Sequence, residues 1–460
     1  MPINEYAMDG DEGFIGLNSR ENPLHLQKGM LSKAVNVRLD RGIARTRKGS
    51  ERMMQYNPQS PFPSIYGSCV ITRPDGTEAI VIVCTDRIYI FNQDNEIFLG
   101  SVLYPNGETV DDNCDVYQAQ GSGYVYICRG FNKTTLRWSG SINPNTIKTP
   151  SNTTHHDYPN TPHAIYYGNR HLVQVDRNTF RVSHYLDDAN WSALDMFSIN
   201  DGSNDSLIAI TPWTLNEFVV FMRNSVFYAS VGVGAYLLGD PAQEDNSYVK
   251  SLATDIGCIA KRSIVQAGGG IIFLSDNGVY ILNPAGAGQG GANTPEGMRL
   301  LTMALPLSAP IEDVILRINY TYAHKSVGIY WENRYYLAVP LDDSEVNNAV
   351  LVYNFVNKNW ESVDTYQSEF DIQSFHIAKK GNRRRLFAVD REMGLFLMES
   401  ENLDYDEYDA VIGVPTLGPP GPKCFLPFTL APLEFLKYNI DSEIITRAYS
   451  LNSTRDKRFS

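Results

Sequence analysis

The feature that most constrains this chain is a repeated pair of apolar runs separated by a short polar turn. The pairs lie at residues 80–91, 124–140, 164–188, 217–230, 270–282, 334–355 and 385–399. Each run is rich in Val, Ile, Phe and Tyr and is about as long as a typical strand. Each break carries Asp, Asn, Ser or Gly, which are residues that favour turns. The pattern predicts a β-hairpin that recurs along most of the chain.

Recurring hairpins favour radial repetition of small sheets over a doubly wound enzyme fold. The seven candidates occupy roughly 340 residues, so one unit takes about 45–50 residues, close to a propeller blade of four short strands. We therefore predict an all-β chain: a β-propeller of about six blades, within a range of five to seven. We expect an additional small β platform region and few short helices. The pattern by itself gives no function.

The first sixty residues differ from the hairpin region. Val35, Val37 and Leu39 alternate with polar residues, which indicates a strand with one buried face. Arg41 and Gly42 form a predicted turn, after which the chain returns as the second strand of a hairpin. The predicted divisions are N-terminal platform strands at 1–60, a propeller at 61–400 with insertions near 231–257 and 283–325, and a linker with C-terminal strands returning to the platform at 401–460.

Two kinds of segment interrupt the hairpin rhythm. Residues 309–320 carry Pro310 near their start and Ile311, Ile315 and Ile318 at helical spacing, which predicts a helix. Residues 231–247 and 283–297 are long and have no core pattern, so we predict loops. We hypothesise that these loops project between subunits or into a lumen.

Composition limits the partners and the compartment. The 460 residues carry a formal net charge of −13, which argues against a general basic surface for nucleic acid. The acidic N-terminus has no signal-peptide pattern, and no apolar run approaches the roughly 20 residues of a membrane span. The six cysteines are irregularly spaced, and reduced, buried thiols are favoured over disulfides or metal ligands. This usage fits a protein that folds in a reducing cytoplasm.

Catalytic and cofactor motifs are not apparent. The sequence has no GxSxG, HExxH, P-loop or strand-associated GxGxxG motif, so we expect neither an enzyme nor a cofactor. His155, His156 and His163 cluster in a polar segment, where loop histidines are favoured over metal ligands.

Two further polar segments have a structural and a functional interpretation. Asp404, Asp406, Glu407 and Asp409 could hold calcium, but they lack the EF-hand order, so a solvated acidic loop is favoured. The segment 275–280 is similar to the aspartate box of sialidase-type propellers, although a plain hairpin turn is the better interpretation.

A basic run follows the predicted N-terminal strand. Its candidate residues for a DNA or subunit contact are Arg38, Arg41, Arg45, Arg47 and Lys48, with Arg52 beyond them. The favoured interpretation is the solvated face of a hairpin, or a rim that faces an acidic neighbour. Contact with DNA phosphates is the sharper alternative.

Four stretches carry a resemblance to a known family. They are GLNSRENPLHLQKGMLSKAVNVRLDRGIARTRKG (16–49), GCIAKRSIVQAGGGIIFLSDNGVYIL (257–282), RINYTYAHKSVGIYWENRYYLAVPLDDSEVNNAVLVYNFVNKNWESVD (317–364) and EIITRAYS (443–450). Together they resemble the nozzle proteins, or tail tubular protein B, of short-tailed bacteriophages. They cover about a quarter of the chain and occur in the family's order.

The resemblance implies a structural protein of the virion tail, assembled in the host cytoplasm. Family members form a homo-oligomeric ring, usually a hexamer, below the tail adaptor protein. Each subunit carries a propeller and a platform. Double-stranded DNA passes transiently along the ring axis, and tail fibres or spikes attach to the flank. Larger relatives continue past the EIITRAYS-like strand, so a distal portion could be missing here.

Two other functions are compatible with a propeller. One is a virion-associated carbohydrate-binding or glycan-cleaving protein, which would need a convergent carboxylate pair and aromatic platforms on one face. The other is an intracellular scaffold, for which the usual Gly-His and Trp-Asp repeat signature is absent from the sequence. Fold alone does not choose among these functions.

Overall fold

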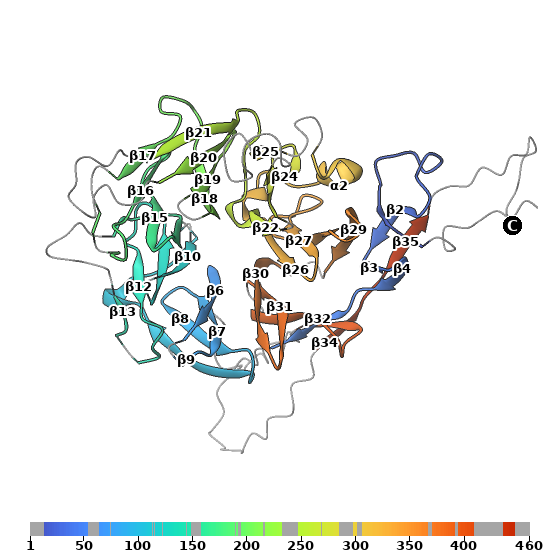
Figure 1. Cartoon of the computed structure of the whole chain (residues 1–460). Helices are drawn as coiled ribbons and strands as arrows, with labels where there is room; N and C mark the ends of the chain where they lie inside the picture. Colours follow the sequence, from blue (N-terminus) through green and yellow to red (C-terminus); the bar gives the residue numbers. More distant parts are fainter. Residues whose placement is uncertain are drawn as a thin grey trace, which may run out of the picture.

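The computed structural model describes most of the chain as short antiparallel sheets arranged around one axis (Figure 1). The described residues are 13–53, 64–148, 158–231, 247–284, 298–300, 306–408 and 436–446, apart from gaps at 74, 113, 115, 122, 144, 189, 192–194, 215–216, 268, 367–369 and 392–393. Some predicted features lie outside them. These are most of the loops at 231–247 and 283–297, the linker at 412–423, and His155, His156, Asp409 and Cys424.

Four sheets of four strands follow one another between residues 67 and 253. Within each sheet the strands pair in chain order and antiparallel, as in a propeller blade. The strands are β6 (Gly67–Thr72), β7 (Glu78–Val83), β8 (Arg87–Asn92) and β9 (Ile97–Leu103); β10 (Val116–Gly121), β11 (Tyr124–Arg129), β12 (Leu136–Trp138) and β13 (Ile147–Lys148); β14 (Ala164–Tyr167), β15 (Arg170–Gln174), β16 (Thr179–Val182) and β17 (Met196–Ser198); and β18 (Leu207–Thr214), β19 (Glu217–Met222), β20 (Val226–Ser230) and β21 (Tyr248–Ala253).

Two more four-stranded sheets bring the number of separate blades to six. Their strands are β22 (Val265–Ala267), β23 (Gly270–Ser275), β24 (Gly278–Pro284) and β25 (Met298–Leu300), and β30 (Ile372–Lys380), β31 (Arg383–Asp390), β32 (Gly394–Ser400) and β5 (Gly49–Arg52). In the last sheet the N-terminal strand β5 runs antiparallel to β32, with Arg52 opposite Phe396. The start of the chain therefore completes the blade formed by residues near its end.

A larger sheet holds a seventh four-stranded meander. It consists of β26 (Val327–Trp331), β27 (Arg334–Val339), β28 (Ala349–Asn354) and β29 (Asn359–Thr365), followed by β1 (Gly16–Leu17), β2 (Met30–Val35) and β35 (Glu443–Thr446). Strand β1 is antiparallel to β29 and parallel to β2, while β35 is antiparallel to β2. Both ends of the chain thus extend one blade outward (Figure 1).

Two small sheets complete the strands of the described residues. They pair β3 (Val37–Asp40) with β4 (Ile43–Thr46), and β33 (Tyr405–Tyr408) with β34 (Leu436–Asn439). We use the name platform for β1–β4 and β35.

The prediction of an all-β propeller of about six blades is confirmed. Six four-stranded sheets are separate, and the meander β26–β29 has the same form within the larger sheet. Each of the seven predicted hairpins falls in a different one of these units. The segment 275–280 is the predicted hairpin turn, with Ser275 opposite Gly278.

The core lies between neighbouring blades. One cluster of buried side chains joins the sheet β6–β9 to β10–β13, and another joins β18–β21 to β22–β25. The cluster between β26–β29 and β30–β32 includes Phe370 and Phe396, whose ring centroids are 5.2 Å apart. Because each blade buries both faces against its neighbours, the ring is a continuous packed body.

Helices are few and short in the described residues. They are the 3-10 turns η1 (Pro105–Gly107), η2 (Lys261–Ser263), η4 (Ala309–Ile311) and η5 (Ala323–Lys325), and the helix α2 (Glu312–Ile315). The predicted helix at 309–320 is thus confirmed for its first half, where Ile311, Val314 and Ile315 pack into the core. Among the described residues, none of the helices has the length and apolar character that a membrane crossing needs.

Candidate functional site

The N-terminal basic residues divide into buried and exposed members. Arg38 and Arg47 are largely buried, with 11% and 2% of their side chains exposed. Arg41 and Arg45 are exposed on the hairpin β3–β4, and Lys48 is half exposed beside Asp404, with 2.6 Å between Nζ and Oδ1. Contacts with DNA or another subunit are therefore open to Arg41, Arg45 and Lys48, whereas Arg38 and Arg47 face the chain's own carboxylates.

Arg47 forms the most enclosed of these ion pairs. Its two terminal nitrogens donate to both carboxylate oxygens of Asp406 at 3.0 and 2.6 Å, and its Nε donates to Asn36 Oδ1 at 3.0 Å. The guanidinium also lies over the ring of Tyr366, 4.4 Å from its centroid. This fork-to-carboxylate geometry, added to cation–π stacking, suits arginine and no other cation.

Asp406 was predicted to lie in a solvated acidic loop, and for this residue the structure corrects the prediction. Only 4% of Asp406 is exposed, and it accepts hydrogen bonds from the backbone N–H and the hydroxyl of Ser50 at 2.9 Å each. The strand β33 is thereby fixed to β5. Its neighbour Asp404 remains exposed, in agreement with the prediction.

Arg38 fixes the platform to two blades at once. It donates to both oxygens of the fully buried Asp364 on β29, and also to Glu399 on β32. Nearby, Arg334 donates through Nε to Glu361 at 2.7 Å, and Glu361 also accepts from the backbone N–H of Leu39.

We call this set the charged seam. Its members are buried or largely buried residues that join the platform and β33 to the propeller: Arg38, Arg47, Arg334, Glu361, Asp364, Glu399 and Asp406. Every basic group in it faces a carboxylate, so its positive charges are compensated inside the chain. Removing one partner of such a buried pair is strongly destabilising, since it leaves the other charge desolvated.

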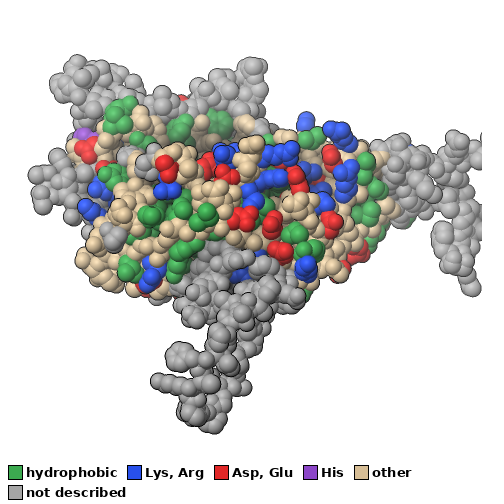
Figure 2. Space-filling model, turned by 90° about the horizontal axis from the view of Figure 1, so that it is seen from below, with side chains coloured by type: hydrophobic (Ala, Val, Ile, Leu, Met, Phe, Trp, Pro, Cys, Tyr) green, Lys and Arg blue, Asp and Glu red, His purple; other side chains and the backbone are tan. Residues whose placement is uncertain are grey.

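The outer edge of the platform is formed by β35. This strand pairs with β2 on one side, and Ile444 and Ile445 are 41% and 46% exposed. Lys33 and Glu443 form an exposed ion pair at 2.6 Å on the same edge. Figure 2 shows the adjoining face from below, with Lys and Arg interleaved with Asp and Glu toward the platform side. Exposed ion pairs of this kind contribute little to stability.

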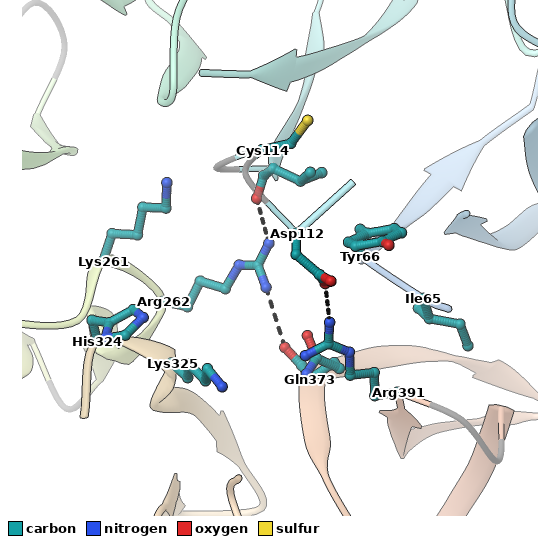
Figure 3. Close-up of a pocket in the computed structure, with 11 residues that line it drawn as sticks. Ile65, Tyr66, Asp112, Cys114, Lys261, Arg262, His324, Lys325, Gln373 and Arg391 are labelled. Carbon is teal, nitrogen blue, oxygen red and sulfur yellow. Dashed lines mark hydrogen bonds and ion pairs between the residues drawn. The ribbon is translucent and has the colours of Figure 1, made fainter. Parts of the chain in front are cut away.

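A second candidate site lies where inner segments of several blades converge (Figure 3). Here a pocket of about 530 Å³ is lined by residues from widely separated parts of the sequence. The lining residues are Ile65, Tyr66, Asp112, Cys114, Val116, Lys261, Arg262, His324, Lys325, Gln373 and Arg391. We call it the axial pocket. No sequence motif indicates this pocket, because its residues have no common spacing and meet only when the ring closes.

The axial pocket is basic. Lys261 and Arg262 come from η2, Lys325 from η5, and Arg391 from the turn after β31. Asp112 pairs with Arg391, and it is the single carboxylate among the residues that line this pocket in the described chain. Figure 3 shows Arg262 reaching between the segments that carry Cys114 and Gln373.

A neighbouring pocket of about 610 Å³ shares Cys114, Lys261 and His324 with the axial pocket. Its cations include Arg129, which pairs with Glu108 at 2.9 Å, and Lys133, which pairs with Asp111 at 2.8 Å. Among the described residues, the carboxylates that line the two pockets are Asp111 and Asp112, and both are engaged by cations. This arrangement differs from the convergent carboxylate pair that glycan cleavage requires.

The predicted loop histidine His163 is a core residue. Only 1% of it is exposed, its Nε2 lies 3.0 Å from the backbone nitrogen of Ile210, and its ring meets Tyr117 edge-on at 4.5 Å. Among the described residues, no group of three His, Cys, Asp or Glu side chains could hold a metal ion.

No disulfide joins the described cysteines Cys69, Cys84, Cys114, Cys128 and Cys258. Burial raises the pKa of Cys69, Cys84 and Cys258 to about 12, so these thiols are protonated at neutral pH. All three pack in or against the hydrophobic clusters between blades.

Comparisons with known proteins assign no family to the chain. No family model matches it, and no curated protein matches it. The WD40 β-propeller domain of Doa1 is similar over 76% of this chain and 95% of its own, with 9% identity and a TM-score of 0.45.

Two further solved structures show the same level of similarity. BBS1N in complex with ARL6DN is similar over 78% of this chain and 99% of its own, with 12% identity and a TM-score of 0.45. BamB from Moraxella catarrhalis is similar over 74% and 84%, with 11% identity and a TM-score of 0.39. At these scores the similarities carry no argument about function.

Proposed function

We propose that this protein is a structural subunit of the tail of a short-tailed bacteriophage, of the nozzle type. In this role, copies form a ring, of hexameric order in the family it resembles, below the tail adaptor protein. The ring conducts and retains the genome, and it anchors tail fibres or spikes during DNA ejection. The proposal rests on the four family-like stretches, together with one feature of the fold.

That feature is the joining of both chain ends to one blade of the propeller. Strands β1, β2 and β35 extend the meander β26–β29 into a seven-stranded sheet, which gives a propeller with a lateral platform. The family-like stretches at 16–49, 317–364 and 443–450 all contribute strands to this sheet. Stretches far apart in the sequence thus meet in one structural unit, which favours a shared role for them.

The mechanical properties of the fold suit a conduit. The blade of β30–β32 is completed by β5, and the charged seam fixes the platform to β29 and β32. A closed ring of packed sheets has short, protected edges and deforms little under load. A subunit that holds back pressurised DNA needs such stiffness and does not need catalysis.

The exposed edge of the platform is a suitable contact between copies. Closed rings require heterologous contacts, in which one surface meets a different surface of the next subunit. Strand β35 presents an edge with Ile444 and Ile445 exposed, and Arg41, Arg45 and Lys48 lie exposed on or beside the hairpin β3–β4 of the same platform. We assign these residues to contact with the next subunit or with passing DNA.

Electron microscopy of the purified protein, with mass photometry over a range of concentrations, tests the proposal. We expect a ring of identical subunits with an open axis, and an antibody-labelled tag on this chain at the tail of the virion. A strictly monomeric protein that is absent from particles would contradict the proposal. Depolymerisation of host glycans by the purified chain would instead favour a glycan-cleaving propeller.

A further inference from the structure

We propose that two C-terminal strands, β34 and β35, are exchanged between copies of this chain. We use the name strap for residues 436–446, which contain both strands. Within one chain the strap pairs with β33 and with β2. In the exchanged arrangement, each strap pairs with β33 and β2 of the next copy. This exchange rests on the ring of the proposed function and specifies the contact that builds it.

The strap is attached to the propeller over little buried surface. From Lys437 to Thr446 every side chain is exposed or half-buried. Tyr438 packs against the cluster between β26–β29 and β30–β32, but no side chain in this described range is itself buried. Because burial of apolar surface is the main favourable contribution to folding, a segment that buries this little detaches at low cost.

Strand β35 also has more open surface than its own chain covers. Neighbouring residues of a strand point to opposite faces of the sheet, so Ile444 and Ile445 present apolar side chains on both faces. They are 41% and 46% exposed. In the described part of the chain, no further strand pairs with the outer edge of β35. An outer strand that is open at its edge and apolar on both faces favours contact with another chain.

The connection between β33 and β34 is unusually long for two adjacent strands. The strands are antiparallel, with Tyr408 opposite Leu436, and residues 409–435 join them. Antiparallel neighbours are usually joined by about two to five residues. A chain as long as 409–435 can span up to roughly 90 Å, about three times the diameter of a small domain. Its length therefore allows the strap to reach a second copy.

The surface that receives the strap is held in place by residues outside the strap. Asn36 donates through Nδ2 to the carbonyl of Asp441 at 2.7 Å, and its Oδ1 accepts from Arg47 Nε at 3.0 Å. Ser32 Oγ donates to the carbonyl of Ile445 at 3.0 Å. The same contacts form whichever copy supplies the strap, so the exchange sacrifices none of them.

Exchange of this kind can build a closed ring. The donor surface is the strap and the acceptor surface is formed by β2 and β33, so two different surfaces of the chain meet. Such heterologous contacts close into a ring when the rotation between copies completes a circle. The copy that receives the strap is also held beside Ile444 and Ile445, whose apolar surface it can cover.

Disulfide cross-linking of chains produced in the same cells tests the exchange. Lys33 and Ile445 lie opposite each other on β2 and β35, and both are exposed, which suits a disulfide between cysteines at these positions. Lys33→Cys on one chain and Ile445→Cys on a differently tagged chain are produced together and oxidised mildly. The matched control pair is Lys379→Cys and Arg384→Cys, which face each other on β30 and β31 within one copy.

We expect a disulfide between the unlike chains of the first pair. It should involve about half of the Lys33→Cys chains, the limit for random mixing around a ring, while the control pair stays unlinked. The double variant with Lys33→Cys and Ile445→Cys on one chain should form the disulfide in either arrangement. Absence of any disulfide in this folded double variant overturns the pairing on which the exchange depends. Wild-type chains treated in the same way show what the native cysteines contribute.

Mass photometry of the same samples separates failure of the exchange from failure of the proposed function. A ring whose unlike chains stay unlinked, while the double variant links within single chains, overturns the exchange and leaves the ring standing. A strictly monomeric protein overturns both. Equal cross-linking of unlike chains in the control pair would show proximity without exchange, and it also overturns the inference.

Discussion

The charged seam and the axial pocket are built from the same residue types but differ in how their charges are balanced. In the seam, Arg38, Arg47 and Arg334 each face a buried carboxylate. In the axial pocket, Asp112, which pairs with Arg391, is 75% exposed, and Arg262 and Lys325 donate to backbone carbonyls. The comparison teaches that a basic run in a sequence can serve internal packing, while a basic pocket can be assembled from residues that no run reveals.

The largest expected effect comes from breaking the seam. Arg47→Met should lower the free energy of unfolding by about 3–5 kcal/mol, because Asp406 is left buried without its counter-charge. Urea unfolding followed by tryptophan fluorescence measures this. The control Lys48→Met removes an exposed partner of Asp404 and should cost about 1 kcal/mol or less. Equal effects of the two substitutions would show that the buried ion pair contributes no more to stability than the exposed one.

The next largest effect concerns the pH dependence of stability, which tests the buried histidines. Burial lowers the pKa of His376 and of His171 to about 4, below the usual 6.5. As pH falls from about 6.5 to about 4, the unfolded chain takes up protons that the folded chain resists, so stability is lost across this window. The variant His376→Gln should lose about 3 kcal/mol less than the wild type between pH 7 and pH 4. If the free energy of unfolding of the two proteins changes equally between pH 7 and pH 4, His376 is not responsible for the loss of stability.

A double substitution separates charge from packing in the seam. Arg47→Met combined with Asp406→Leu removes both charges, so it should be more stable than Arg47→Met alone. A loss of about 1–3 kcal/mol relative to the wild type should remain, because the backbone N–H of Ser50 loses its acceptor. Calorimetric melting of the four proteins of this cycle gives the coupling energy. If the double variant is no more stable than Arg47→Met, then packing and not charge accounts for the contribution of Arg47 to stability.

The smallest expected effect lies in the axial pocket. Lys325→Gln should change the free energy of unfolding by no more than about 0.5 kcal/mol, since its amino group faces a carbonyl and is partly exposed. The same unfolding assay in low and high salt measures this. A loss of stability as large as that of Arg47→Met would show that Lys325 stabilises the fold as much as the arginines of the seam do.

Sequence patterns predicted the inner part of each blade better than its rim. The predicted hairpins correspond mainly to central strands such as β23 and β28, in which every residue is buried. Strands buried on both faces form continuous apolar runs, which are conspicuous in a sequence. The outer strands β9 and β17 are partly exposed and mixed in composition, so they gave no comparable signal.

Long-range pairing explains what could not be predicted. Strand β5 has the sequence GSER, which carries no strand pattern, yet it completes a blade through its partner β32. Asp406 looked solvated because its partner Arg47 is 359 residues earlier in the chain. The axial pocket likewise collects Tyr66, Lys261 and Arg391 from distant segments. Without contacts, a single sequence does not reveal such encounters.

The pairing of β5 with β32 also sets the order of events during synthesis. Arg52 leaves the ribosome more than 340 residues before Phe396, its partner across the sheet. Until then, β5 has no partner strand, and the first and last blades of the nascent chain are not joined. The ring of blades therefore closes only after β32 has been synthesised, and a chain released before that point would display an unpaired strand edge prone to joining other chains.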